Sequence, residues 1–360
     1  MTKVLEVSFG GLGFDGSSSV IYSIAEALQG KIEFEFLVFS KKNSRESEFA
    51  QIGKVNRING YSGNILEKIF RSRIFYKELY KLCKGNNYDV IHCHNLPDAG
   101  VILKAAKKAG VKLRIVHSHQ TKSTRKTSIF RKFKNKRNLR LIEKYATHKI
   151  GCSIQACRDF YKDNDYKVIY NSVDLNKFNI KNKEKNISPS FIHVGRFAYP
   201  KNQRFLLKVF KEIKEREKDA SLLLIGYGND EKVIRKDILS YGLEDNVKIV
   251  QGDNDFVAKS FAQANYMIFP SFFEGFSIVL IEAQASGCYC FASDAIVEEV
   301  DCGLMKKIPL EKDAKTWAEI ILNDIKNKNL WDEEELLIKI NKFDRKVITE
   351  QYFRLYNGEL

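Results

Sequence analysis

The stretch that most constrains the fold of this chain runs from Tyr266 to Asp294. An apolar run over Tyr266–Phe269 stops at a Pro-Ser pair, which is typical of a buried strand that ends at a loop. Ile278–Ala285 then follows a helical pattern, and Cys288–Ala292 is apolar again. The stretch therefore predicts a strand, loop, helix, strand unit, the βαβ element of an α/β sheet.

Two glutamates flank the start of the predicted helix. Glu274 lies in the loop before it, and Glu282 lies about a turn and a half into it. The free amides near Ser277, Ile278 and Val279 favour a phosphate. A phosphate between two carboxylates that accept hydrogen bonds from hydroxyls suggests a nucleotide sugar as the ligand.

The length and composition predict a two-domain globular protein. At 360 residues the chain exceeds the size at which one core keeps growing, and 44% hydrophobic with 29% charged residues is ordinary. Neither a signal peptide nor an apolar run of about 18 residues is evident, so we expect a cytosolic protein that does not span a membrane. The seven cysteines are odd in number and lack a paired CxxC spacing, which predicts buried free thiols.

The positive charge is concentrated in one segment of the first half. Lys104–Lys149 contains 16 Lys/Arg and a single acid, Glu143, so it accounts for the whole net charge of +15. Within it, residues 121–149 interleave cations with aromatic side chains. This pattern is compatible with nucleic-acid binding, with a solvated helix or with an anionic membrane surface.

Residues 11, 13 and 16 spell GxGxxG after the first predicted strand, which raises the possibility of a dinucleotide oxidoreductase. That interpretation needs an acid at the end of the second strand to bind the ribose. The strand Phe34–Phe39 ends instead in Ser-Lys-Lys, which disfavours NAD but leaves an NADP-dependent enzyme as an alternative.

Two further patterns allow a metal site. His92 and His94 end one predicted strand and His117 and His119 end the next, so four imidazoles could meet at one sheet edge. Histidines that are simply hydrogen-bonded at the strand ends are the other interpretation. The acidic turn Asp253–Asp255 resembles a DxD metal motif, but a cap for the helix over Phe256–Ala262 is favoured.

The second half opens with a pattern suited to a diphosphate. The strand that begins at Phe191 ends at Gly195-Arg196, and Lys201 follows at the turn into a helix, so two cations flank the turn. The next strand ends in Gly226-Tyr227-Gly228, a turn at which a nucleobase could lie.

The phrase from Pro270 to Asp294 resembles the donor-site signature of retaining glycosyltransferases of family 4, which have the GT-B fold. The resemblance implies an α/β protein with two Rossmann-like doubly wound domains facing each other across a cleft. It places an acceptor domain at residues 1–178, a nucleotide-sugar domain at 190–343, and a terminal helix at 344–360 that crosses back to the first domain. The family's glycines are replaced by Asp15 and Ser172 here.

The resemblance also implies site roles. Arg196 and Lys201 match the phosphate-binding pair, Glu282 the ribose contact and Glu274 the donor-hexose contact, and His119 matches the histidine that meets the donor sugar. The residues expected to bind the donor are Gly16, Ser17, Gly226, Gly228, Phe276, Ser277, Ile278, Val279 and Glu282.

The implied activity is metal-independent transfer of a hexose from a nucleotide sugar, with UDP favoured, to a hydroxyl of a lipid-linked or glycan acceptor. No cofactor beyond the nucleotide sugar and no nucleic acid are expected. Residues 121–149 would hold the enzyme to the anionic inner face of the cell membrane. The Lys-, Asn- and Ile-rich composition suggests an AT-rich bacterium and hence capsule or exopolysaccharide assembly. An NADP oxidoreductase, a nucleic-acid-binding protein and a phosphorylase of the same fold remain alternatives.

Overall fold

The computed structural model divides into two units, each described by itself. It describes residues 1–8, 11–13, 16–39, 45–58, 65–94, 98–119, 129–161, 165–184, 188–327 and 332–360. Unit 1 comprises Met1–Ser172 and Lys346–Leu360, and unit 2 comprises Val173–Arg345. The predicted boundary at residue 178 lies a little beyond this division, because the Phe178 ring packs 6.3 Å from that of Phe261 in unit 2.

The described part of unit 1 contains a seven-stranded parallel sheet in the order β3-β2-β1-β4-β5-β6-β7. The central strands read as nearly continuous apolar runs because helices cover both faces of the sheet. The strand order reverses between β1 and β4, which in such sheets is where ligands bind. The strands are β1 (Lys3–Ser8), β2 (Glu33–Val38), β3 (Lys54–Arg57), β4 (Val90–Cys93), β5 (Leu113–Ser118), β6 (His148–Gly151) and β7 (Lys167–Val168).

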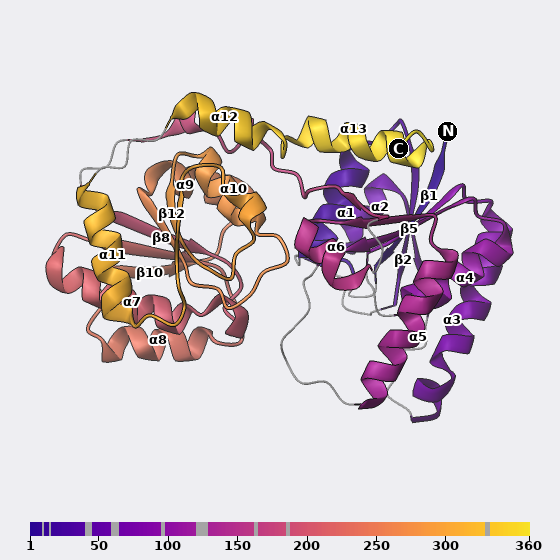
Figure 1. Cartoon of the computed structure of the whole chain (residues 1–360), viewed down its shortest axis with the longest axis horizontal. Helices are drawn as coiled ribbons and strands as arrows, with labels where there is room; N and C mark the ends of the chain where they lie inside the picture. Colours follow the sequence, from indigo (N-terminus) through magenta and orange to yellow (C-terminus); the bar gives the residue numbers. More distant parts are fainter. Residues whose placement is uncertain are drawn as a thin grey trace. The chain divides into compact units, whose positions relative to one another are not determined.

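Helices α3, α4 and α5 pack side by side in unit 1 (Figure 1). The contact between α4 and α5 is close because Gly100 has no side chain, and a Cβ there would lie 2.5 Å from Cβ of Leu141. The Gly100 amide also donates to Oδ1 of Asn138 at 2.8 Å. The helices are α1 (Gly16–Ala27), α2 (Glu46–Ile52), α3 (Ile65–Asn86), α4 (Ala99–Ala109), α5 (Ile129–Tyr145) and α6 (Ile154–Phe160).

Unit 2 repeats the same plan with a six-stranded parallel sheet in the order β10-β9-β8-β11-β12-β13 among the described residues. Here the order reverses between β8 and β11. The strands are β8 (Ser190–Val194), β9 (Ser221–Ile225), β10 (Val247–Val250), β11 (Tyr266–Phe269), β12 (Tyr289–Ser293) and β13 (Met305–Ile308). Two parallel sheets of this order confirm the predicted fold class of two Rossmann-like α/β domains.

The helices of unit 2 that follow its strands are α7 (Gln203–Arg216), α8 (Glu231–Ser240), α9 (Asn254–Gln263), α10 (Ile278–Ala285) and α11 (Ala314–Lys326), with short 3₁₀ turns η1 (Ile180–Asn182), η2 (Tyr199–Lys201) and η3 (Glu298–Val300). Asp253 caps α9 by accepting the Phe256 amide at 2.9 Å, and Asp255 pairs with Lys177 at 2.6 Å. The acidic turn is therefore a helix cap, as the sequence favoured.

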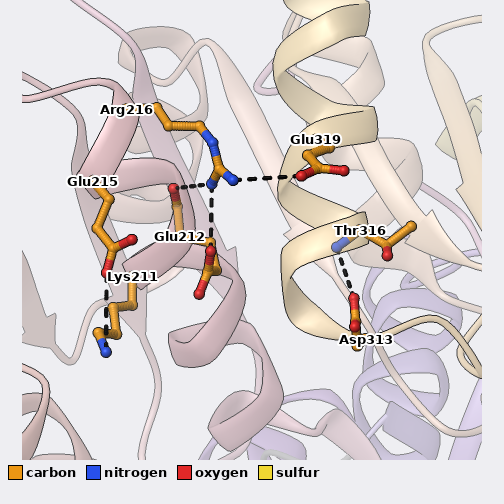
Figure 2. Close-up of polar contacts among 7 residues, drawn as sticks. All are labelled: Lys211, Glu212, Glu215, Arg216, Asp313, Thr316 and Glu319. Carbon is orange, nitrogen blue, oxygen red and sulfur yellow. Dashed lines mark hydrogen bonds and ion pairs between the residues drawn. The ribbon is translucent and has the colours of Figure 1, made fainter.

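Figure 2 shows how α7 and α11 are joined on one face of unit 2. Arg216 donates to the carbonyl oxygen of Glu212 at 2.8 Å and reaches Glu319 of α11 at 3.5 Å. Asp313 caps α11 through the Thr316 amide at 2.8 Å. Beneath these exposed contacts the fully buried Trp317 packs edge-on against Phe205, so apolar packing supplies most of the stabilisation of this pair.

Two helices close the chain. Helix α12 (Glu333–Asn341) belongs to unit 2, where Val173 bonds to Phe343 and Arg345 through backbone hydrogen bonds. Helix α13 (Arg345–Tyr356) carries the chain back to unit 1, and its Tyr356 ring packs edge-on 6.1 Å from that of Phe34.

The fold also shows the state of the cysteines. All seven cysteines are buried and none forms a disulfide, as predicted. No helix in the described residues is both long and apolar enough to cross a membrane.

Candidate functional site

The predicted donor site lies at the point where the strand order of unit 2 reverses. The loop after β8 and the loop after β11 leave the carboxyl ends of neighbouring strands, where parallel α/β sheets bind ligands. Arg196 and Lys201 are on the first loop and Glu274 is on the second. The sheet topology therefore brings together residues that are more than seventy positions apart in the chain.

The first loop is fixed by close backbone packing. A Cβ on Gly226 would lie 2.1 Å from the carbonyl oxygen of Gly195, and one on Gly228 would lie 2.2 Å from that of Phe197. Backbone cannot move aside as a side-chain tip can, so both positions require glycine. Gly226 and Gly228 thus have a structural role, because they allow the backbone of the loop that carries Arg196 and Lys201 to pack closely against them.

A buried histidine supports the same loop through hydrogen bonds. His193 is fully buried, and burial lowers its pKa to about 4, so the ring is neutral. Its Nδ1 lies 2.9 Å from the carbonyl oxygen of Ile268, which can only accept, so Nδ1 carries the proton. Gln203 donates to Nε2 at 3.3 Å and to the carbonyl oxygen of Arg196 at 3.0 Å. Sequence reasoning missed this support.

The two loops are fastened directly to each other. The Phe272 amide donates to the carbonyl oxygen of Pro200 at 2.9 Å, and the Asn202 side chain donates to that of Pro270 at 3.1 Å. The exposed rings of Tyr199 and Phe272 stack with centroids 4.9 Å apart. The loops therefore form one preorganised surface.

Lys201 is the cation at the centre of this surface. Its ammonium group lies 2.6 Å from Oε1 of Glu274 and 4.6 Å from the centroid of the Phe269 ring. Both partners in the ion pair are only part-exposed, so the interaction is less screened than a surface pair. The neighbouring Arg196 is exposed, and its guanidinium forms no ion pair with the described residues.

Helix α10 begins beside these loops with its first amides available. Ser277 is the N-cap residue, but its side chain makes no capping bond. Its buried Oγ has no partner among the described residues, and the same holds for Oγ of Ser271. The first amides of a helix, here those of Ile278 and Val279, have no acceptor within the helix. Amides and hydroxyls left unpaired at a helix N-terminus form a site suited to an anion.

Glu282 lies on α10 and is part-exposed. Burial raises the pKa of its carboxyl to about 7, against the weaker opposing effect of Lys177. Its carboxylate forms no hydrogen bond or ion pair with the described residues. A raised pKa on an unpaired carboxylate next to an anion site marks a functional candidate.

Phe276 differs from the other predicted donor-binding residues. It is buried, and its ring packs 5.7 Å from that of Phe343. Its side chain therefore belongs to the core of unit 2 and is not placed to contact a ligand.

The remaining predicted residues are in unit 1. Gly16 begins α1, where a Cβ would meet no atom within 4 Å, and Ser17 follows it. Residue 15, at which the family glycine is replaced, lies outside the described residues, as do residues 121–128 of the basic segment. His119 immediately follows β5.

The four histidines at the ends of β4 and β5 do meet, as one of the sequence interpretations required. The rings of His92 and His94 lie 3.9 Å apart, as do those of His117 and His119. Glu6 of β1 lies beneath them, with Oε2 at 2.6 Å from Nε2 of His94. Sequence reasoning missed Glu6, although an acid within an otherwise apolar strand was a signal that could have found it.

Three of these rings could approach a metal ion. The ligand atoms of His92, His94 and His117 lie within 4.8 Å of one another. Both nitrogens of His94 are already engaged, by Glu6 and by His119, so a metal bound through His94 would displace one of these bonds. The hydrogen-bonded interpretation thus accounts for His94.

Two family models match this chain over adjacent segments. Residues 14–177 match "Glycosyltransferase Family 4", and residues 175–301 match "Glycosyl transferases group 1". Together they span residues 14–301 of the chain.

Curated relatives agree. The capsular polysaccharide biosynthesis glycosyltransferase CapH of Staphylococcus aureus is 32% identical over 77% of this chain and 79% of its own length. A UDP-Gal:α-D-GlcNAc-diphosphoundecaprenol α-1,3-galactosyltransferase of Escherichia coli is 28% identical over 60% of each chain.

A solved structure supports the fold over the whole length. Anabaena Alr3699/HepE, crystallised in complex with UDP, superimposes with a TM-score of 0.81 at 18% identity and covers 99% of this chain and 100% of its own. With the family models and the CapH relationship, this likeness shows that the chain is a GT-B glycosyltransferase and belongs to glycosyltransferase family 4.

Proposed function

We propose that this glycosyltransferase moves a hexose from a UDP-sugar to a hydroxyl of a lipid-linked glycan during the assembly of a bacterial surface polysaccharide. The observation that carries the proposal is the surface made by two fastened loops and the start of α10. It combines Arg196 and Lys201 with unpaired hydroxyls and helix amides, and it has Glu274 and Glu282 at its edge.

The donor diphosphate would bind to the amides of Ile278 and Val279 and to the hydroxyl of Ser277. Lys201 and Arg196 would stabilise the negative charge that grows on the leaving diphosphate. The loops that carry these groups are already hydrogen-bonded to each other, so little reorganisation would be needed during the reaction. We propose that these groups replace the metal ion that other nucleotide-sugar enzymes use.

The rest of the donor would be held by acceptor groups. We propose that Glu282 accepts hydrogen bonds from the ribose, Glu274 from the donor hexose, and His119 from the donor sugar. The base would lie against the Gly226–Gly228 turn, whose Tyr227 is half-exposed. In unit 1, the backbone of Gly16 and Ser17 would lie close to the diphosphate.

The proposed transfer retains the configuration of the anomeric carbon. The acceptor oxygen bonds to that carbon on the same face from which the bond to the diphosphate oxygen breaks. The acceptor proton passes to the departing phosphate oxygen. A retaining glycosidase uses a carboxylate nucleophile on the opposite face, whereas the proposed transfer needs no such nucleophile.

The acceptor proposal rests on the charge of α5. Phe133, Lys134, Lys136, Arg137 and Arg140 line a groove of about 490 Å³ on this helix. Lys134 pairs with Asp98, whereas Lys136, Arg137 and Arg140 form no ion pair with the described residues, and Phe133 is largely exposed. Unpaired cations beside an exposed aromatic ring suit the anionic inner surface of a membrane. The galactosyltransferase relative acts on a diphosphoundecaprenol substrate, which agrees with a lipid-linked acceptor.

A thermal-shift panel tests the donor class. A ligand that binds only the native protein raises the melting temperature, so UDP and one or more UDP-hexoses should do so at concentrations well above their Kd. NADPH serves as the control for the oxidoreductase alternative. Stabilisation by NADPH and by no nucleotide sugar would contradict the proposal.

A further inference from the structure

Beneath His119, a chain of hydrogen bonds starts at a buried carboxylate. Oε2 of Glu6 lies 2.6 Å from Nε2 of His94, and Nδ1 of His94 lies 2.8 Å from Nε2 of His119. Glu6 and His94 are both almost fully buried. Strand register explains the meeting, because Glu6 of β1 pairs with His92 of β4, and His94 projects from the same side as His92 at the end of that strand.

The donor and acceptor in each of these hydrogen bonds follow from the charge of the Glu6 carboxylate. Burial alone would raise the pKa of Glu6, but the facing His92 and His94 hold it well below its usual range, so Glu6 is ionised and can only accept. Nε2 of His94 must therefore carry a proton. Burial lowers the pKa of His94 to about 4, so the ring is neutral and its Nδ1 is an acceptor.

The protonation of His119 follows from that of His94. Because Nδ1 of His94 accepts, Nε2 of His119 must donate. Burial and the neighbouring imidazoles keep the pKa of His119 well below its usual value, so this ring is neutral too. Its Nδ1 then carries no proton. That atom is shielded from solvent and has no partner among the described residues, although the residue as a whole is part-exposed.

We propose that Glu6 and His94 are positioning residues that hold His119 in the Nε2-protonated tautomer, so that Nδ1 recognises a hydrogen-bond donor, a hydroxyl of the donor sugar. A phosphate or carboxylate offers only acceptors at neutral pH and would be refused at this atom. The inference rests on the proposed function for the identity of the ligand. The tautomer itself does not depend on it.

Tyr356 provides a matched control within the same cluster. Its hydroxyl donates to the other oxygen of Glu6, Oε1, at 2.7 Å, and lies 2.8 Å from Nδ1 of His92. Tyr356→Phe therefore removes one hydrogen bond from Glu6 without touching the bond to His94. Glu6→Gln instead removes the negative charge that determines the donor and acceptor in the hydrogen bonds linking Glu6, His94 and His119.

The test measures ring-nitrogen protonation in the full-length protein by long-range ¹H–¹⁵N correlation spectroscopy at neutral pH, with His119 assigned from the His119→Gln spectrum. We expect a protonated Nε2 and an unprotonated Nδ1 on His119 in the wild type and in Tyr356→Phe. In Glu6→Gln we expect the single tautomer to be lost. A wild-type His119 protonated at Nδ1, or an unchanged tautomer in Glu6→Gln, would overturn the proposal. The wild-type spectrum decides the matter even if Glu6→Gln does not fold.

Transfer assays with deoxyfluoro donor sugars separate this inference from the proposed function. Fluorine cannot donate, so replacing the recognised hydroxyl should lower kcat/KM about tenfold or more in the wild type and much less in Glu6→Gln. Equal losses in both proteins would contradict recognition through Nδ1. Absence of transfer from every UDP-sugar would contradict the proposed function but would not change the tautomer assigned to His119.

Discussion

The ammonium group of Lys201 lies 2.6 Å from Oε1 of Glu274, and this ion pair links the loop after β8 to the loop after β11. In the proposed mechanism the same ammonium group stabilises the charge that develops on the leaving diphosphate. Lys201 therefore has both a structural role, in linking the two loops, and a proposed catalytic role.

Replacement of Lys201 tests that double role. Lys201→Ala should lower kcat/KM for transfer by about 10²- to 10³-fold, the usual effect of losing one group that stabilises transition-state charge. Lys211→Ala is the control, since Lys211 is a part-exposed lysine on α7 that makes a surface contact with Glu215. Steady-state kinetics that were the same for both variants would contradict the role given to Lys201.

Glu282 should impose a pH dependence on stability. Its pKa is about 7 in the folded protein and 4.5 ordinarily, so the folded state binds its proton more tightly than the unfolded chain. The sign follows: the contribution of Glu282 to stability falls as pH rises from about 4.5 to 7, and the deficit is complete above 7. Glu282→Gln should therefore be more stable than the wild type at pH 8, by about 1 kcal/mol or 2–4 °C in Tm, and nearly equal to it at pH 4.5.

The same substitution should weaken nucleotide binding, because an amide offers one acceptor where the carboxylate offers two. We expect the Kd for UDP to rise about tenfold or more at pH 8. Calorimetry and thermal unfolding on one preparation measure both effects. A variant that gained stability and kept its affinity for UDP would show that Glu282 does not contact the ribose.

The glycine turn after β9 should tolerate no side chain. Gly226→Ala places a Cβ against the backbone oxygen of Gly195, and we expect a loss of about 1–3 kcal/mol in unfolding free energy, with weakened UDP binding. Gly85→Ala is the control, because Gly85 is exposed near the end of α3 with no atom within 4 Å of a Cβ there. That variant should be stabilised by about 0.5–1 kcal/mol, as is usual for Gly to Ala in a helix. Chemical denaturation of both proteins provides the comparison.

The groove on α5 should bind anionic membranes. Neutralising Lys136, Arg137 and Arg140 with glutamine should weaken binding to vesicles containing phosphatidylglycerol by roughly 100-fold at low salt, since each cation contributes about 1 kcal/mol. Neutralising the exposed lysines Lys232, Lys236 and Lys248 of unit 2 removes the same charge elsewhere and should have little effect. Vesicle binding that ignored both salt and anionic lipid would exclude this surface as the membrane contact.

Much of the fold could be predicted from local patterns in the sequence. The apolar runs ending at Phe269 and Ile225 and the helix over Ile278–Ala285 are observed with those ends. The cap at Asp253 was also predicted, because caps and buried strands are encoded within a few residues. The placement of Lys201 beside Glu274 needed the strand order, which a family resemblance supplied and periodicity alone does not.

The parts that could not be predicted depend on contacts distant in sequence. Glu6 and His94 are separated by 88 positions, and Glu6 and Tyr356 by 350. No sequence pattern near these residues identifies their partners, apart from the unusual presence of an acid in a buried strand. The burial of Phe276 is similar, because it depends on Phe343 packing against it.

The central claim is that the donor diphosphate binds at the start of α10. The most direct test is a crystal structure of the full chain with UDP. We predict the diphosphate within hydrogen-bond distance of the Ser277–Val279 amides, with Lys201 and Arg196 on its oxygens and the ribose hydroxyls on Glu282. UDP bound elsewhere in the protein, with these groups untouched, would contradict the account.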